Sequence, residues 1–141
     1  MHLVRHRTQH PPDPVVRDLL AHAIWPPTPE HATDVLRETY GGSGADLYLL
    51  VENGDPVGLI GVRGTAPGAA VITHIAVTPD RRLCGIGRRI VEAVRRQASL
   101  RILIAETDRD AVDFYRRCGF MVESLGERYP GVERFLCTYS G

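Results

Sequence analysis

The chain has 141 residues, 43% of them hydrophobic, and its 17 basic and 17 acidic residues give a formal net charge of zero. This length suits one domain with a real hydrophobic core, expected over residues 1–141, and the neutral charge argues against nucleic-acid binding through bulk charge. Three well-separated cysteines without a C-x-x-C pair and six scattered histidines predict neither a disulfide framework nor a metal site, and the lack of a long apolar stretch or a signal-peptide core predicts a cytoplasmic protein without membrane contact.

The first third of the chain predicts a short strand and two helices. The strand covers residues 2–7, and a helix from about Val15 to Trp25 follows three prolines, which a first helical turn accepts. A second helix, from about Glu30 to Thr39, places its apolar residues on one side. Trp25 and Tyr40, at the ends of these helices, are interpreted as core residues in preference to ligand contacts.

The middle of the chain predicts an antiparallel meander of three strands. Leu47 to Glu52 and Pro56 to Arg63 are apolar or alternating runs, and Asn53-Gly54 between them is typical of a tight hairpin turn. A second turn, from Thr65 to Gly68, leads into the third strand, from Ala69 to Thr78. This strand is rich in β-branched residues, as a buried strand prefers.

A basic, glycine-rich loop and a helix follow the third strand. Apolar residues at helical spacing predict a helix from Ile86 to Gln97, so Gly85 and Gly87 lie at its first turn. The first N–H groups of a helix lack intrahelical partners, and together with the helix dipole they form a site for anions, above all phosphate. Glycines would let a ligand approach these groups closely, and Arg82 and Arg88 add positive charge. The alternative is a plain strand–turn–helix in which the glycines serve only the turn.

The last third predicts a strand, a helix and two final strands. The strand from Arg101 to Glu106 comes after a helix, so we expect it to lie parallel to the Ala69–Thr78 strand through a right-handed crossover. A helix then begins near Thr107, a candidate N-cap, and ends at Gly119, which suits the left-handed conformation after a helix. The final strands are Phe120 to Leu125 and Val132 to Tyr139, joined by a loop from Gly126 to Gly131.

The chain carries two motifs: Arg-x-x-Gly-x-Gly, formed by Arg82, Gly85 and Gly87, and D-x-x-A-x-x-F-Y-x-x-x-G-F, from Asp108 to Phe120. Together they resemble the two signatures of the GNAT superfamily of N-acetyltransferases. The second motif usually begins with asparagine, which donates and accepts hydrogen bonds, whereas the Asp108 carboxylate only accepts them. The resemblance implies an α/β (α+β) fold: a mixed, mostly antiparallel central sheet of about seven strands flanked by four helices, with a splayed pair of parallel strands at the acyl-CoA site.

The resemblance also implies acetyl-CoA as the acyl donor and co-substrate. Its pyrophosphate would lie on the glycine-rich loop, and its pantetheine arm would pair with the main chain of a splayed strand. Tyr115 would be the general acid that returns a proton to the CoA thiolate, the alternative being a core tyrosine beside Phe114. The residues implied to bind the co-substrate are Ile75, Ala76, Val77, Arg82, Leu83, Cys84, Gly85, Ile86, Gly87, Arg88, Asp108 and Tyr115.

The general base is harder to place. Many GNAT proteins carry a glutamate two residues before the position of Ile75, but Thr73 occupies that place here and cannot act as a base. His74 titrates in the right range, although strand alternation turns it to the opposite face unless a bulge re-aims it. Glu106, at the end of its strand, and a chain of water molecules are the alternatives.

By this resemblance the chain is an N-acetyltransferase that transfers an acetyl group from acetyl-CoA to a primary amine of a small molecule or peptide by direct attack. The resemblance places one wall of the acceptor site in the paired helices before the first long strand. The 126–131 loop, with Glu127 and Tyr129, is a second candidate for choosing the acceptor, unless it is a plain surface turn. The alternative function is an acyl-CoA-binding regulatory or sensor module with a degenerate catalytic site, and a homodimer is left open.

Overall fold

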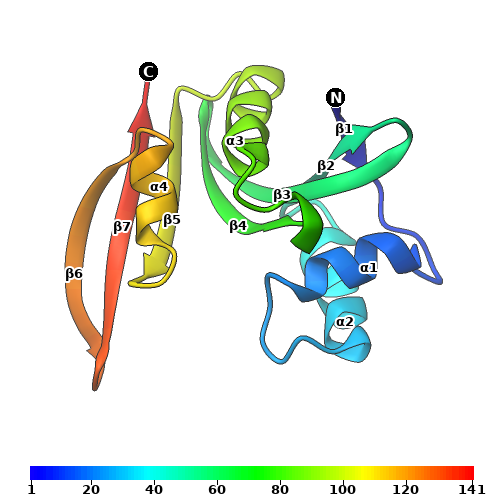
Figure 1. The fold of residues 1–141 in the computed structure, drawn as a ribbon, viewed down its shortest axis with the longest axis horizontal. Helices are drawn as coiled ribbons and strands as arrows, with labels where there is room; N and C mark the ends of the chain where they lie inside the picture. The colour runs from blue at the N-terminus through cyan, green and yellow to red at the C-terminus, as the bar shows by residue number, and fades with distance from the viewer.

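Seven strands form one sheet in the computed structural model, which describes residues 1–141. The strands are β1 (His2–His6), β2 (Asp46–Glu52), β3 (Asp55–Ala66), β4 (Ala69–Val77), β5 (Ile102–Asp108), β6 (Met121–Tyr129) and β7 (Val132–Ser140). Their order across the sheet is β1-β2-β3-β4-β5-β7-β6, and every neighbouring pair is antiparallel except β4 and β5 (Figure 1). The mixed, mostly antiparallel sheet is therefore confirmed.

Two pairs of helices cover opposite faces of this sheet. The helices are α1 (Pro14–Ala21), α2 (Pro29–Tyr40), α3 (Ile86–Gln97) and α4 (Val112–Arg117), with a short 3-10 turn, η1 (Pro79–Arg81), before α3. Leu59 belongs to the apolar cluster under α1 and α2, whereas its neighbour Ile60 belongs to the cluster under α3 and α4. Successive residues of a strand point to opposite faces, so each helix pair lies on its own side of the sheet. None of the four helices has the length and apolar composition that a membrane-spanning helix requires.

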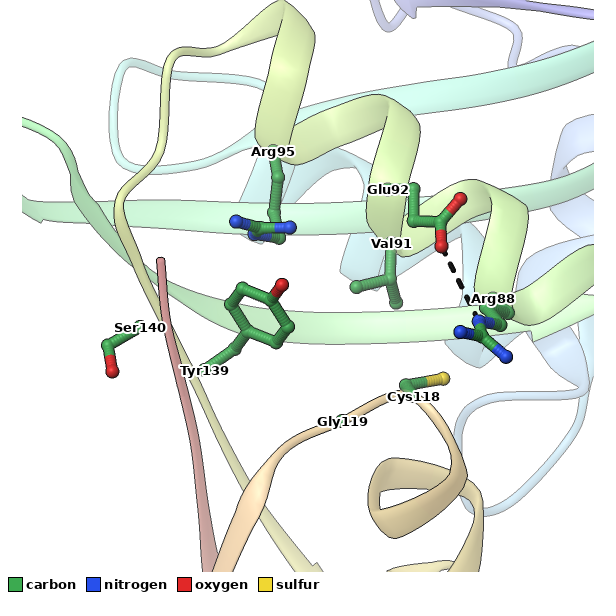
Figure 2. Close-up of a pocket in the computed structure, with 8 residues that line it drawn as sticks. All are labelled: Arg88, Val91, Glu92, Arg95, Cys118, Gly119, Tyr139 and Ser140. Atoms are coloured by element: carbon green, nitrogen blue, oxygen red, sulfur yellow. Dashed lines mark ion pairs between the residues drawn. The ribbon is translucent and has the colours of Figure 1, made fainter.

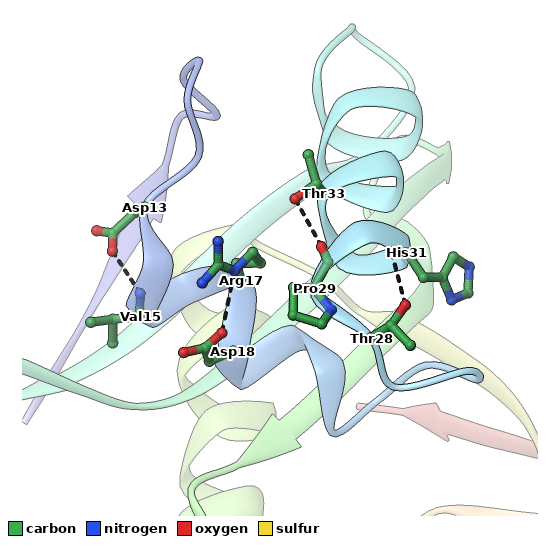
Figure 3. A network of polar contacts seen from close by, with 8 residues as sticks. All are labelled: Asp13, Val15, Arg17, Asp18, Thr28, Pro29, His31 and Thr33. Carbon is green, nitrogen blue, oxygen red and sulfur yellow. Dashed lines mark hydrogen bonds and ion pairs between the residues drawn. The ribbon is translucent and has the colours of Figure 1, made fainter.

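Side-chain caps fix where α1 and α2 begin. The Val15 N–H donates to Asp13 Oδ1 at 2.9 Å, and the His31 N–H donates to Thr28 Oγ1 at 3.1 Å (Figure 3). Each cap is followed by a proline at the first helical position, where its missing N–H costs nothing. The two helices expected in this region are therefore present, with α2 close to its expected bounds.

The end of α1 and the position of Trp25 differ from the expectation. The helix ends at Ala21, and Trp25 lies in the connection to α2 with 84% of its surface exposed. Pro26 and Pro27 follow it, and a residue before proline is disfavoured in the helical region, so the helix cannot run through Trp25. The interpretation of Trp25 as a core residue is wrong, whereas Tyr40 is only 6% exposed and does lie in the core.

The parallel pair β4–β5 is short, and this opens the sheet. The two strands pair only at Ala69–Ile102, Ala70–Leu103 and Val71–Ile104, and they diverge after these positions (Figure 1). On its other side β4 stays paired with β3 as far as Val77. One edge of β4 therefore lacks a strand partner from Ile72 onward, which is the splay that the resemblance implied.

The last hairpin is longer than expected. β6 continues through Gly126 to Tyr129, and these residues pair with the start of β7, so only Pro130 and Gly131 form the turn. The expected loop from Gly126 to Gly131 is therefore wrong: most of it is the arm of a hairpin. The sequence suggested a loop because two glycines bracket the segment, but Gly126, with φ +77, lies at an irregularity of the ladder instead.

The start of α4 also differs from the expectation. Thr107 belongs to β5 and does not cap the helix; instead, Asp108 Oδ1 accepts the N–H groups of Asp110 and Ala111 at 3.0 and 3.2 Å. The end of α4 is as expected. Gly119 has φ +91, its N–H donates to Arg116, and the next N–H donates to the Tyr115 carbonyl, which is the Schellman pattern.

Candidate functional site

The N-terminal end of α3 presents main-chain N–H groups without protein partners. Gly85 caps the helix with φ +78, and the first helical hydrogen bond is donated by Arg89 to the Gly85 carbonyl. The N–H groups just before Arg89 therefore point out of the helix end, where the dipole is positive. The loop before the helix is exposed, Leu83 fully so, which leaves this end of α3 accessible.

The two glycines of the loop have different roles. A Cβ at Gly85 would meet nothing within 4 Å, so this position is open and needs glycine for its positive φ. A Cβ at Gly87 would lie 2.5 Å from Cε1 of Phe114, and Gly87 is buried. Only Gly85 fits the expectation that glycine leaves room for a ligand. At Gly87 the ring of Phe114 fills the space where a Cβ would lie, and this contact packs α3 against α4.

Ion pairs set the charge of this loop. Arg81 donates to both carboxylate oxygens of Glu52, at 2.5 and 3.1 Å, which ties η1 to the β2–β3 hairpin. The hydrogen bond from Arg81 holds the pKa of Glu52 below its usual value. Arg82 donates from Nε to the Val77 carbonyl at 3.3 Å and pairs with no carboxylate, whereas Arg88 lies 3.4 Å from Glu92. Arg82 therefore contributes positive charge that no carboxylate offsets.

The unpaired edge of β4 lies beside this helix end. Ile75, Ala76 and Val77 are the last three residues of β4, and their edge toward β5 has no strand partner. Main-chain groups on such an edge pair readily with an extended ligand. The edge of β4 and the N-terminal end of α3 are joined by η1 and the loop of Leu83 to Gly85. A ligand with an extended arm and an anionic group can therefore contact both.

Tyr115 belongs to α4 and points into the core beneath it. It is 5% exposed, its ring packs edge-on against Phe114 and Phe120, and its hydroxyl makes no hydrogen bond within the protein. Arg95 Nε is the only side-chain polar atom that is both fully buried and without a hydrogen-bond partner. The Tyr115 hydroxyl also lacks a partner, so it is not fully buried and keeps some contact with solvent. Burial raises the pKa of Tyr115, which keeps the hydroxyl protonated and able to donate.

A bulge in β4 brings Thr73 and His74 to the same face of the sheet. Gly61 pairs with His74 but the next residue, Val62, pairs with Ile72, so Thr73 is the extra residue. Before the bulge Ile72 packs under α3, whereas after it Ala76 packs under α1 and α2, which shows that the alternation has reversed. His74 is therefore re-aimed to the α2 face, the condition under which it was a candidate.

Tyr40 joins this pair. Its Oη lies 2.6 Å from Thr73 Oγ1 and 2.5 Å from His74 Nδ1. Burial raises the pKa of Tyr40 to about 12, and burial, helped by Arg63 and His31, lowers the pKa of His74. Both groups are therefore neutral near pH 7. The core position of Tyr40 was predicted from the sequence, but its contact with Thr73 and His74 was not; the only signal for that contact was that a buried tyrosine hydroxyl needs a partner.

Glu106 and Asp108 stand apart from this cluster. Leu103 and Ala105 pack under α3 and α4, so Glu106 points to the opposite face of β5, where its carboxylate is half exposed and lies 3.5 Å from Arg134 Nε. Asp108 uses one carboxylate oxygen to hold the first turn before α4. The second oxygen of Asp108 makes no hydrogen bond within the protein. No group of three or more His, Cys, Asp or Glu side chains is arranged to hold a metal ion.

A hollow of about 280 Å³ lies between α3 and the end of α4 (Figure 2). Arg88 and Arg95 border it from α3, Cys118 borders it from the end of α4, and Tyr139 borders it from β7. The guanidinium of Arg95 stacks 3.6 Å from the centre of the Tyr139 ring. Apart from Arg88, no residue predicted for the site borders this hollow, which lies on the opposite face of the sheet from Tyr40 and His74.

The comparisons with known proteins agree with this geometry. The family profile described as the acetyltransferase (GNAT) domain matches residues 43–122, more than half of the chain. The peptidyl-lysine N-acetyltransferase YjaB of Escherichia coli (strain K12) is 34% identical over 94 residues, which cover 61% of this chain and 60% of that relative's length.

Solved structures share the fold across nearly the whole chain. A protein described as an acetyltransferase of the GNAT family from Desulfovibrio desulfuricans has a TM-score of 0.78 at 24% identity, covering 98% of this chain and 97% of that one. A GNAT family acetyltransferase from Elizabethkingia anophelis with acetyl-CoA bound has a TM-score of 0.68 at 21% identity, covering 99% and 97%. The family profile, the relative YjaB and the shared fold agree, and the chain belongs to the GNAT acetyltransferase family.

Proposed function

We propose that this protein is an acyl-CoA-dependent N-acetyltransferase that transfers the acetyl group of acetyl-CoA to a primary amine of a small molecule or peptide, with residues 1–141 acting as one domain. The observation that carries the proposal is the open end of α3 beside the unpaired edge of β4. One feature fits a diphosphate and the other fits the extended pantetheine arm. Arg82, whose charge is not offset by a carboxylate, complements the phosphate charge.

Different residues of the chain bind different parts of acetyl-CoA. N–H groups of the loop and the first turn of α3, from Leu83 to Arg88, hold the pyrophosphate, with Arg82 beside them. Main-chain groups of Ile75 to Val77 hold the arm as an added strand would be held. An N–H group of that edge polarises the thioester carbonyl and stabilises the negative charge that develops on it. The free Asp108 oxygen can accept a hydrogen bond from the arm but cannot donate one.

Proton transfers complete the proposed reaction. A primary amine is mostly protonated near pH 7, so one proton must leave before the nitrogen can attack. His74 is the proposed base, because the bulge places it on the face of α2 and burial keeps it neutral. Glu106 is already paired with Arg134, which makes it the weaker candidate. Tyr115, protonated in its buried position, is the proposed acid for the leaving thiolate.

Small amines and lysine-containing peptides are the two acceptor classes of this proposal. The relative YjaB is named a peptidyl-lysine N-acetyltransferase, so lysine-containing peptides should be tested alongside small amines. This chain contains no lysine, which means that any acetyl-lysine detected after reaction belongs to the added peptide.

Turnover tests the proposal. Purified protein and acetyl-CoA should release free thiol in the presence of at least one amine of a panel of polyamines, aminoglycosides and lysine peptides, and the amine should gain one acetyl group by mass. Binding of acetyl-CoA without thiol release for any amine would refute the enzyme and favour the regulatory or sensor module.

A further inference from the structure

Tyr40, the last residue of α2, sits between Thr73 and His74 with no room for water between them. Its hydroxyl is 2.6 Å from Thr73 Oγ1 and 2.5 Å from His74 Nδ1, and its ring meets the His74 ring edge-on at 5.7 Å between centroids. On the neighbouring strand β3, a Cβ at Gly61 would collide with the Tyr40 hydroxyl and with Thr73 Oγ1. The lack of a side chain at Gly61 therefore makes space for this chain of three polar groups.

The number of protons on Tyr40, Thr73 and His74 decides which hydrogen bonds each side chain can donate and accept. A phenol carries one proton and can donate one hydrogen bond, while its oxygen can also accept. When His74 is neutral, Nδ1 can accept from Tyr40 and Tyr40 can accept from Thr73. When His74 is protonated, both ring nitrogens carry protons, so Nδ1 must donate to the Tyr40 oxygen and the Tyr40 proton must turn to Thr73 Oγ1. Thr73 is thus the acceptor that the protonated state requires.

We propose that Tyr40 and Thr73 are positioning residues whose hydroxyls form a reversible two-bond relay, which orients the His74 imidazole and gives Nδ1 a partner in both its neutral and its protonated state. The inference rests on the proposed function for its chemical use: the proton leaving the amine is held on His74, and no other bond is made or broken in this step. The ring nitrogen Nε2 faces away from Tyr40 and is left to exchange that proton.

The surroundings of His74 make this relay necessary. The charged or titratable groups that act on it are Arg63 of β3 and His31 of α2, and both oppose a positive charge on the ring, as does its burial. No carboxylate contacts His74 to offset these effects. The two hydroxyls are therefore the groups that stabilise the protonated ring, since hydrogen bonds to a charged group are stronger than bonds between neutral groups.

The test is an NMR titration of the imidazole, which needs neither substrate nor activity. The signal of His74 is identified by its loss in His74→Asn. Thr73→Val removes the acceptor that the protonated state needs but leaves the Tyr40-to-Nδ1 bond of the neutral state, so the pKa of His74 should fall by on the order of one pH unit. Thr73→Ser keeps the hydroxyl and should restore the value of the unmodified protein.

Two further variants control this result. Tyr40→Phe keeps the ring and should also lower the pKa of His74, and if it fails to fold the Thr73 pair still decides the matter. Thr65→Val makes the same change on an exposed position of β3 with no side-chain hydrogen bond, and should leave His74 unaffected. Equal pKa values in Thr73→Val, Thr73→Ser and the unmodified protein, or an equal fall in Thr65→Val, would overturn the relay.

The pH profile of kcat/KM separates this inference from the proposed function. If His74 is the base, rate is lost at low pH as it becomes protonated, so the acid limb should move to lower pH in Thr73→Val together with the NMR titration. A shifted NMR titration with an unmoved acid limb would uphold the relay and remove His74 from the role of base.

Discussion

Gly87 provides a sharp test of how α3 and α4 fit together. A Cβ at Gly87 would lie 2.5 Å from Cε1 and 2.9 Å from Cζ of Phe114, whereas carbon atoms in good contact are about 3.5–4.0 Å apart. Relieving such an overlap typically costs about 1–3 kcal/mol. Alanine also gains up to about 1 kcal/mol over glycine in a helix. The Gly87→Ala variant should therefore be destabilised by about 1 kcal/mol, the difference between the two effects.

A double-mutant cycle isolates the contact. Phe114→Leu removes the ring atoms that a Cβ at Gly87 would meet, so in that background Gly87→Ala should be neutral or stabilising, and the two substitutions should couple by about 2 kcal/mol. Urea unfolding of the four proteins measures the coupling. Gly64→Ala, on strand β3, is the control for the coupling to Phe114→Leu, because a Cβ there meets nothing within 4 Å. Coupling below about 0.5 kcal/mol, the usual scatter of independent sites, would refute the packing role of Gly87.

Three more outcomes are expected. Tyr115→Phe should lower kcat by about ten-fold or more with little change in the KM for acetyl-CoA; an unchanged kcat, with chemistry rate-limiting, would make Tyr115 a packing residue. Glu127→Gln with Tyr129→Ala alters the exposed β6 arm near its turn and should raise the acceptor KM alone; if neither KM changes, the hairpin only connects. Glu52→Gln removes the Arg81 pair, whose stabilisation is present above the unfolded pKa of 4.5 and lost as pH falls through the lowered folded value, so the Tm difference from the unmodified protein should begin to shrink below about pH 4.5 and vanish once the pH is below that folded value.

Much of the fold could be predicted because local patterns and the resemblance agree. The Asn53-Gly54 turn has positive φ at both residues, as its hairpin requires, and α3 begins at Ile86 as its apolar spacing indicated. The errors arose where two local signals compete. A helical pattern continued to Trp25 although the prolines beyond it end α1 earlier, and bracketing glycines suggested a loop where the ladder of β6 and β7 continues.

The candidate site could be predicted from the sequence only where it depends on main-chain geometry. The open end of α3 follows from the glycine-rich loop, since every helix leaves its first N–H groups unpaired. The cluster of Tyr40, Thr73 and His74 could not be predicted, because its partners come from α2 and β4 and meet through a bulge that breaks the alternation of β4. The packing of Gly87 against Phe114 likewise depends on the contact between two helices distant in sequence.

The most direct test of the account is the affinity for acetyl-CoA of a loop charge reversal. By calorimetry, Arg82→Glu should raise the Kd by about ten-fold or more, because it replaces a charge-assisted contact to phosphate by repulsion, and the loss should shrink as salt is raised. Arg128→Glu makes the same charge change on an exposed residue of β6 and should leave the Kd unchanged. An Arg82→Glu variant that binds acetyl-CoA as tightly as the unmodified protein, or equal weakening in both variants, would contradict a co-substrate site at the end of α3.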